Sequence, residues 1–298
     1  PSRMAAMQSA ALASMAAEDR PSPTTSCTRG VAEMAERIIG LGERILAEAT
    51  ATLRCGYLRF TFPENESANL IMNFSRRIGG KADSEEITVV NNSTVEGHIK
   101  CTPAGGGLGR GGGGIGYDLY FVCQFSESAE KMSFFENEEY IKGEPLSHNG
   151  NDVGIVARFG TLDSPLVVRC GISYVDIEGA RNNLSVEGNT FDFDFVKNNA
   201  VKAWEDAFAG VDVEGTNETD LILFYTCLYH TLLDPRTAMD CDGRFALNNK
   251  VFAAPDYTHR TVFSGWDVYR SEFPLLSIIC PSTVRDTVSS LLKVAEEK

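Results

Sequence analysis

The sequence predicts a two-domain protein of the β plus α class, with an antiparallel β-sandwich followed by a helical linker and by the first helices of a second domain. After residue 51, short β-rich runs alternate with turn residues at a spacing that suits a sandwich. After Asn182, the apolar residues recur at the spacing of a helix. The chain has 298 residues, of which 43% are hydrophobic and 23% charged. This balance is that of a globular protein with one large domain or two ordinary ones.

Residues 1–50 form a leader whose structure the sequence leaves uncertain. Its Ala- and Met-rich start is compatible with the end of a secretion signal and also with a disordered or weakly helical segment. The first of these weakly favours a secreted or periplasmic location. Apolar residues at helical spacing predict a helix over 31–49, at Met34, Ile38, Leu41 and Ile45.

Residues 51–193 are predicted to form the sandwich. Each run is rich in β-branched and aromatic residues and is bounded by Gly, Asn, Ser or Pro, as antiparallel strands are. The predicted strands are Leu58–Phe62, Ala68–Phe74, Ile87–Val90, Val95–Cys101, Tyr117–Phe125, Val153–Arg158 and Leu166–Ser173.

Helices are predicted for the rest of the chain. A linker helix within 194–215 ends near Gly210, and a helix capped by Thr219 is stopped by Pro235. Further helical runs are predicted from Trp266 to Ile278 and from Pro281 onward. Residues 216–298 therefore read as the start of a helical domain. Two or three amphipathic helices leave an apolar face without a partner, so we expect more sequence to follow.

The charge of the chain excludes one class of partner. The net charge is −14 at pH 7 and the pI is near 4.8. Nucleic acids are bound through clustered Lys and Arg, so a nucleic-acid partner is not predicted. No apolar run is long enough to cross a bilayer, so membrane insertion is not predicted either. The sequence gives no indication of the oligomeric state.

Eight cysteines are spread along the chain without a C-x-x-C pair and without a histidine at zinc-finger spacing. A zinc site is therefore not predicted. The even number is compatible with disulfides, and the wide spacing is equally compatible with scattered buried thiols. The sequence leaves both alternatives open.

Asp240-Cys-Asp-Gly suggests a calcium loop, because alternate carboxylates can converge on a hard cation. An EF-hand needs its glycine at the sixth position and a glutamate at the twelfth, whereas the glycine here comes fourth and Val251 lies at the twelfth. A turn after Pro235 is therefore the favoured interpretation.

Trp266-Asp267 has the composition of a sugar contact. A tryptophan ring packs against the C–H face of a pyranose, and an adjacent carboxylate accepts hydrogen bonds from vicinal hydroxyls. Taken alone, the pair would more often be a core tryptophan followed by a helix-capping aspartate.

Several segments, in order, resemble glycoside hydrolase family 92. They run from Thr52-Leu-Arg-Cys-Gly-Tyr-Leu-Arg-Phe-Thr-Phe-Pro, which is similar to a strand pair of the family's N-terminal β-sandwich, to Leu292. Gly171-Ile-Ser-Tyr-Val-Asp-Ile-Glu-Gly-Ala-Arg-Asn-Asn-Leu is similar to the strand that leaves the sandwich. Phe224-Tyr-Thr-Cys-Leu-Tyr-His-Thr-Leu-Leu-Asp-Pro resembles an early helix of the family's (α/α)₆ barrel, and Phe263-Ser-Gly-Trp-Asp-Val-Tyr-Arg-Ser resembles part of its sugar pocket.

The resemblance implies a calcium-dependent exo-α-mannosidase that inverts at the anomeric carbon and acts on mannose-containing glycans. It places Trp266 and Asp267 in the subsite for the terminal mannose and Arg270 in a supporting position. It also implies that the catalytic carboxylates and the calcium ligands belong to later parts of the barrel, beyond Lys298. We therefore expect no catalytic residue and no metal ligand in this chain, and no activity from it alone. The alternatives are a non-catalytic carbohydrate-binding protein and a purely structural piece.

Overall fold

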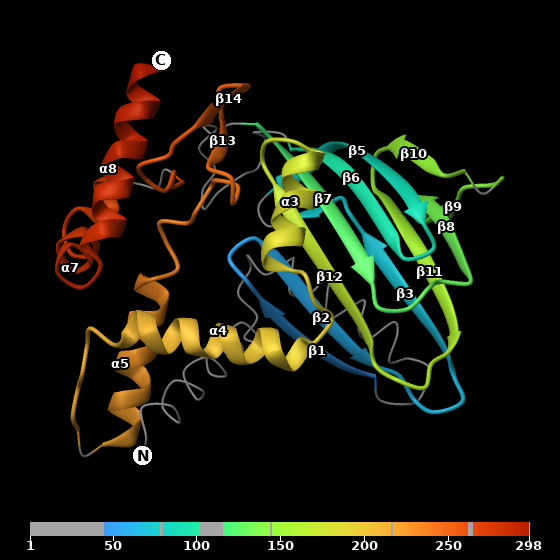
Figure 1. Ribbon diagram of the computed structural model, residues 1–298, viewed down its shortest axis with the longest axis horizontal. Helices are drawn as coiled ribbons and strands as arrows, with labels where there is room; N and C mark the ends of the chain where they lie inside the picture. Colours follow the sequence, from blue (N-terminus) through green and yellow to red (C-terminus); the bar gives the residue numbers. More distant parts are fainter. Residues whose placement is uncertain are drawn as a thin grey trace. The chain divides into compact units, whose positions relative to one another are not determined.

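The computed structural model describes residues 45–77, 80–101, 116–143, 145–215, 217–261 and 265–297 (Figure 1). These residues divide into two compact units. The sandwich unit comprises residues 45–197 together with Asp240–Asp242, and the helical unit comprises the described residues of 198–239 and 243–297. Most of the predicted leader, including residues 31–44 of its predicted helix, lies outside the described residues.

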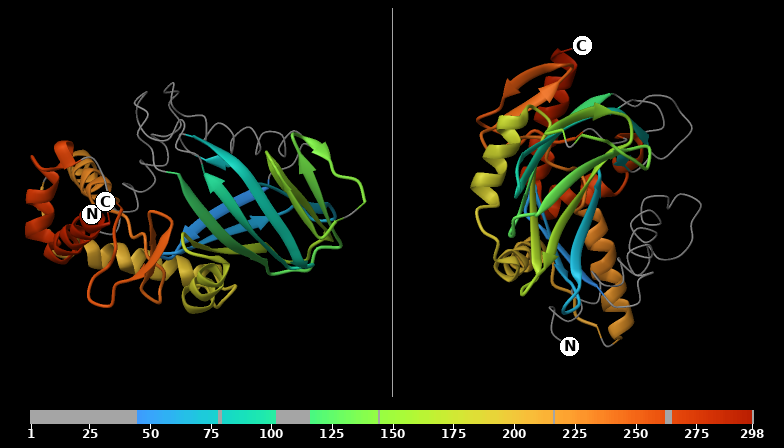
Figure 2. Two further views of the ribbon diagram at one scale, coloured as in Figure 1. Left: turned by 90° about the horizontal axis from the view of Figure 1, so that it is seen from above. Right: turned by 90° about the vertical axis from the view of Figure 1, so that its right-hand side faces the viewer.

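The sandwich unit contains two antiparallel sheets that face each other (Figure 2). The larger sheet has the order β1 (Leu46–Ala51), β2 (Cys55–Thr61), β12 (Leu166–Ser173), β7 (Tyr117–Phe125), β6 (Thr94–Cys101), β5 (Gly80–Asn91) and β10 (Ser147–Gly150), with β4 (Arg76–Arg77) paired to β5. The smaller sheet has the order β3 (Ser67–Asn73), β11 (Val153–Thr161), β8 (Lys131–Glu136) and β9 (Glu139–Tyr140).

The core of the sandwich lies between these sheets. It is filled by the strand side chains that point inward, which are every second residue along a strand. In β6, Val95, Gly97, Ile99 and Cys101 are buried, while the residues that alternate with them are more exposed. In the large sheet, β5, β6, β7 and β12 contribute side chains to this core. In the small sheet, β3, β8 and β11 do so. The alternation in the sequence therefore corresponds to one buried face per sheet.

The opposite face of the large sheet is covered by helices. α3 (Ile177–Glu187) lies along it, and the start of α4 (Phe193–Phe208) packs beside it (Figure 1). This second apolar layer joins Tyr57 and Val167 of the sheet to Leu184 of α3. The central strands are thus buried on both faces, which explains why β12 and β7 contain consecutive apolar residues.

The described part of the helical unit contains the rest of α4 and six further elements. They are α5 (Glu218–Thr231), the hairpin β13 (Arg244–Leu247) and β14 (Lys250–Ala253), α6 (Gly265–Val268), α7 (Glu272–Ile279) and α8 (Pro281–Glu296). A small aromatic core forms where α4 meets α5. Phe208 and Tyr225 are buried there, and the Trp204 ring lies 4.6 Å from that of Tyr229 between centroids.

The predicted fold class is confirmed, since sandwich-like sheets are followed by helices. Each predicted strand coincides with an observed one, but three local predictions are wrong. Residues 46–49 belong to strand β1 and not to a helix, because pairing with β2 overrides the helical preference of an Ala-rich segment. The segment predicted to leave the sandwich as a strand becomes helix α3 after Ser173. The cap of α5 is Asn217, whose side chain accepts a hydrogen bond from the Thr219 N–H.

Across the part of the chain that the structure describes, no helix has both the length and the apolar character needed to cross a membrane.

Candidate functional site

The segment predicted to contact a sugar begins at Phe263, which lies outside the described residues, and continues into α6. Trp266 and Asp267 are consecutive residues of this short helix, and Arg270 follows in the turn before α7. All three side chains are exposed. They therefore share one segment of the helical unit, at its surface.

Trp266 is 72% exposed, which excludes it from the apolar clusters formed by the described residues. The chain has two tryptophans, and the other one behaves differently. Trp204 is packed in the aromatic core of the helical unit, stacked on Phe208 with ring centroids 5.7 Å apart. Trp266 is therefore the tryptophan whose indole ring is largely exposed to solvent and available to a ligand.

Asp267 and Arg270 lie beside this ring in the sequence, but the structure does not join them to each other. Asp267 lies inside the first turn of α6, so it does not cap the helix, in contrast to the commoner role of an aspartate after a core tryptophan. The Arg270 guanidinium carbon is 5.5 Å from the centroid of the Tyr269 ring, a cation–π distance. A carboxylate and a guanidinium next to an exposed indole supply hydrogen-bond acceptors and donors for sugar hydroxyls.

A carboxyl group that follows this segment has a perturbed pKa, which no sequence pattern predicts. Burial raises the pKa of Glu272, at the start of α7, and the negative charge of Asp234 adds to the shift. Both effects disfavour the charged form. No sequence signal marks this residue, because its shift arises from burial and from a residue on a distant segment.

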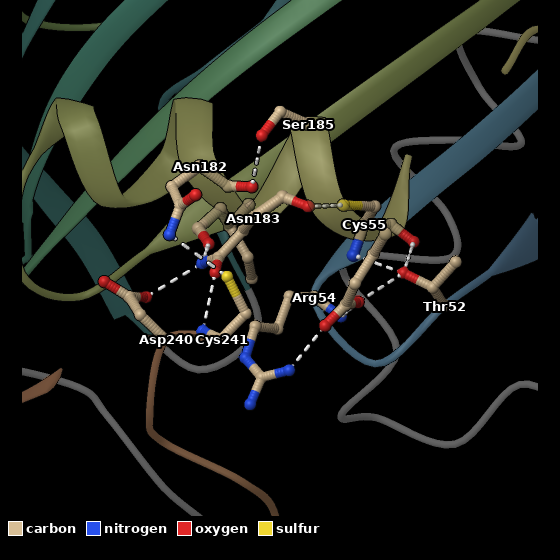
Figure 3. A network of polar contacts seen from close by, with 10 residues as sticks. Thr52, Arg54, Cys55, Asn182, Asn183, Ser185, Asp240 and Cys241 are labelled. Carbon is tan, nitrogen blue, oxygen red and sulfur yellow. Dashed lines mark hydrogen bonds and ion pairs between the residues drawn. The ribbon is translucent and has the colours of Figure 1, made fainter. Parts of the chain in front are cut away.

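The Asp240-Cys-Asp segment belongs to the sandwich unit, where it joins a buried polar network beside α3 (Figure 3). Asp240 is 3% exposed. Its carboxylate accepts hydrogen bonds from the Ser173 hydroxyl at 2.7 Å and from the Asn183 amide at 2.8 Å. The Asn183 amide also donates to the Ile172 carbonyl at 2.8 Å, and its oxygen accepts from the Cys241 N–H at 2.8 Å. Asp240 thus holds the turn against the sheet.

A second part of the same network ties the end of α3 to the segment between β1 and β2. Glu187 accepts hydrogen bonds from the Thr52 hydroxyl at 2.7 Å and from the Arg54 N–H at 2.8 Å, and it forms an ion pair with the Arg54 guanidinium (Figure 3). Such satisfied contacts fix the position of α3 on the sheet.

The carboxylates of the Asp240-Cys-Asp segment were also considered as metal ligands. Among the described residues, no three or more His, Cys, Asp or Glu side chains are grouped so that they could hold a metal ion. The turn interpretation of Asp240-Cys-Asp-Gly is confirmed, since residues 241–242 form a turn and Gly243 follows with φ of +85°. The Asp240 carboxylate is used for hydrogen bonds to neutral side chains.

Two family models match the chain, one after the other. The model described as the glycosyl hydrolase family 92 N-terminal domain matches residues 33–173, and that of the glycosyl hydrolase family 92 catalytic domain matches residues 179–298. The first match ends at the end of β12, and the second begins in the first turn of α3. Comparison with curated protein sequences gives no significant match.

Solved structures share the fold. A family GH92 α-mannosidase from Bacteroides thetaiotaomicron has a TM-score of 0.76 and 24% sequence identity, and it has also been solved in complex with mannoimidazole. A family GH92 inverting mannosidase from Bacteroides thetaiotaomicron VPI-5482 has a TM-score of 0.73 and 20% identity. The matches cover 85% of this chain but 34% and 33% of those chains. This chain therefore spans about a third of the length of the structures it matches.

Proposed function

Because the chain belongs to glycoside hydrolase family 92, we propose that it takes part in the hydrolysis of terminal α-linked mannose, with inversion at the anomeric carbon and with calcium as the assisting ion. The observation that carries the proposal is the ordered match of both family domains over residues 33–173 and 179–298. Support for mannose comes from two of the structural neighbours, an α-mannosidase that has also been solved in complex with mannoimidazole and an inverting mannosidase.

We assign the terminal mannose to the exposed face of α6. The Trp266 indole stacks on the C–H face of the ring, the Asp267 carboxylate accepts hydrogen bonds from its hydroxyls, and Arg270 supports this contact. The exposure of Trp266 supports this role, because a ring buried in the core could not reach a ligand.

Inverting hydrolysis also needs a general acid and a general base on opposite faces of the sugar, with room for a water molecule between them. We assign no residue of this chain to either task. Calcium belongs to the proposed reaction as a whole, and we assign none of the described residues to it. We propose that sugar binding at α6 does not need calcium, because the contacts assigned to it are made by the side chains of Trp266, Asp267 and Arg270.

The 298-residue protein is expected to show no turnover above the uncatalysed rate on an aryl α-mannoside with calcium present, because the acid–base pair is not assigned to this chain. Release of the aryl group, followed by absorbance, measures this. Turnover comparable to that of an intact glycosidase would show that the chain contains its own catalytic pair.

Trp266→Ala is expected to weaken binding of methyl α-mannoside about tenfold or more, because stacking on an aromatic ring is removed while the backbone of α6 is retained. Isothermal titration calorimetry measures the affinity, with and without a chelator. A Trp204→Phe variant leaves Trp266 as the single tryptophan, so its fluorescence reports directly on ligand binding.

Ile278→Ala is the matched control, since Ile278 of α7 is 78% exposed and is not assigned to the sugar. It should leave the affinity unchanged. Equal affinity of wild type and Trp266→Ala, or loss of all binding heat on addition of chelator, would remove α6 from the proposed subsite.

A further inference from the structure

Two cysteines lie directly opposite each other on neighbouring strands of the large sheet. In the antiparallel pairing of β12 with β7, Cys170 is aligned with Cys123. Both side chains point into the core between the two sheets, where Cys123 is buried and Cys170 packs against the buried cluster. Both are free thiols in this structure. The register thus places two thiols on the same face of adjacent strands.

The hydrogen bonds around this pair show which kind of cross-strand site it is. The Ser126 N–H donates to the Val167 carbonyl on the β12 side, whereas the Phe125 N–H donates to the Ser93 carbonyl on the β6 side. The direction of the backbone groups alternates at each residue of a strand, so Cys123 points its N–H and C=O toward β6, as Phe125 does. Cys123 and Cys170 are therefore a non-hydrogen-bonded pair.

At non-hydrogen-bonded positions the two Cα atoms are about 4.5 Å apart and the side chains make their closest approach. A disulfide requires a Cα–Cα distance of about 4.4–6.8 Å, with the two Cβ atoms directed toward each other. The typical spacing of a non-hydrogen-bonded pair lies within this range, and the side chains of Cys123 and Cys170 are on the same face of the sheet. In keeping with this proximity, the interaction with the Cys170 side chain is the main reason that the pKa of Cys123 is raised. Burial of the thiol raises the pKa further.

From this geometry we propose that Cys123 and Cys170 form an intrachain disulfide between β7 and β12 when the protein meets a disulfide oxidant. The sandwich unit would then have a covalent link across the centre of its larger sheet. This inference concerns the sandwich alone and does not depend on the proposed mannosidase function.

The chemistry is thiol–disulfide exchange, in which a small disulfide such as oxidised glutathione is the electron acceptor. Cys170 is the less buried of the two, so its thiolate attacks first, breaks the glutathione S–S bond and releases one glutathione thiolate. Cys123 then loses its proton and attacks the Cys170 sulfur, which releases the second. Two electrons and two protons pass from the two cysteines to one glutathione disulfide, which becomes two glutathione thiols.

The pairing is selective, because the other cysteines of the described sandwich residues are placed elsewhere. Cys55 is aligned with Gly171, one residue along β12, so its side chain lies on the opposite face of the sheet, in the layer beneath α3. Cys101 is aligned with Tyr117, six residues or roughly 20 Å along β7 from Cys123. Cys241 lies at the surface of α3, where its sulfur accepts a hydrogen bond from Asn182.

The test uses the full 298-residue chain, first reduced and then equilibrated with excess oxidised glutathione. Free thiols are blocked with N-ethylmaleimide, and the protein is digested without reduction and analysed by mass spectrometry. We expect one linked pair of peptides, containing Cys123 and Cys170 and lighter by two hydrogens than the sum of the two thiol peptides. Cys123→Ser and Cys170→Ser should each abolish the link, and the matched control Cys55→Ser should retain it.

Circular dichroism of each variant shows whether its sheet content is that of the wild type. If a serine variant does not fold, the wild type and Cys55→Ser still decide the question. Recovery of Cys123 and Cys170 as two maleimide adducts from folded, glutathione-treated wild type would overturn the proposal, and so would a link from either residue to any other cysteine.

Discussion

Gly179→Ala is expected to lower the free energy of unfolding of the sandwich unit by about 3 kcal/mol. A Cβ atom at Gly179 of α3 would collide with the Asp240 carboxylate and would lie 2.6 Å from the Ser173 hydroxyl oxygen. Because all three groups are buried, the carboxylate has to leave the hydrogen bonds that it accepts from Ser173 and Asn183. Urea denaturation followed by circular dichroism measures the change.

Gly56→Ala is the matched control for this substitution. Gly56 lies in β2 with no atom within 4 Å of the position that its Cβ would take, so the same methyl group should change stability by less than about 0.5 kcal/mol. The added cost of Gly179→Ala should also shrink in a protein that already carries Asp240→Ala, since the collision with the carboxylate is then removed and the close approach to Ser173 remains. A Gly179→Ala protein as stable as wild type would mean that the turn at Asp240 does not dock on α3 in this way.

The second large effect is expected on acidification, through His259 of the helical unit. This side chain is 5% exposed, stacks on the Phe245 ring with centroids 3.8 Å apart, and has a buried Nδ1 without a hydrogen-bond partner among the described residues. Burial lowers its pKa from 6.5 to about 4. The folded protein therefore holds this imidazole neutral in a range where the unfolded chain protonates it.

The sign of the pH dependence follows from this difference. Above pH 6.5 both states are neutral at His259 and the residue contributes nothing to the pH dependence. As the pH falls from 6.5 toward 4, the unfolded state binds a proton that the folded state does not, so stability is lost over that window. At a pH of about 4.5 the loss from this residue is about 2–3 kcal/mol.

His259→Phe should abolish this part of the acid sensitivity, because phenylalanine can stack on Phe245 and does not titrate. The measurement is the difference in unfolding free energy between wild type and variant at neutral and at acidic pH. The exposed His230 supplies a control, since His230→Gln leaves the buried histidine in place and should lose stability on acidification as wild type does. Parallel pH profiles for wild type and His259→Phe would contradict the prediction.

The strands of the sandwich could be predicted from the sequence because their signal is local. β6 alternates buried and less buried residues at a period of two, β7 is a run rich in apolar residues, and turn residues bound both strands. β1 was missed because an Ala-rich segment prefers a helix, and its strand conformation comes from pairing with β2 along its whole length. A preference that depends on a partner strand cannot be read from the segment itself.

α3 was missed for a related reason. Its buried positions include Asn183 and Gly179 as well as apolar residues, so the helical pattern is weak. Asn183 is buried because Asp240, 57 residues later, provides its hydrogen-bond partner. A contact between residues so far apart in the sequence cannot be recognised from the pattern of either segment.

For the candidate site, the sequence resemblance marked Trp266, Asp267 and Arg270, and their role in binding stays a prediction. Glu272 could not be found in this way, because its perturbation comes from burial and from Asp234.

The position of Asp240–Asp242 has a consequence for how the protein is made on the ribosome. The sandwich unit is discontinuous, because Asp240 completes a network with Ser173, which precedes it by 67 residues. Asn183 of α3 precedes Asp240 by 57 residues, so at a synthesis rate of about 5–20 residues per second the sheets and α3 wait roughly 3–11 s before their last polar partner is synthesised. During that interval Asn183 has no carboxylate to bind. Translation speed between β12 and the Asp240 turn therefore sets how long an unfinished sandwich is exposed to chaperones and proteases.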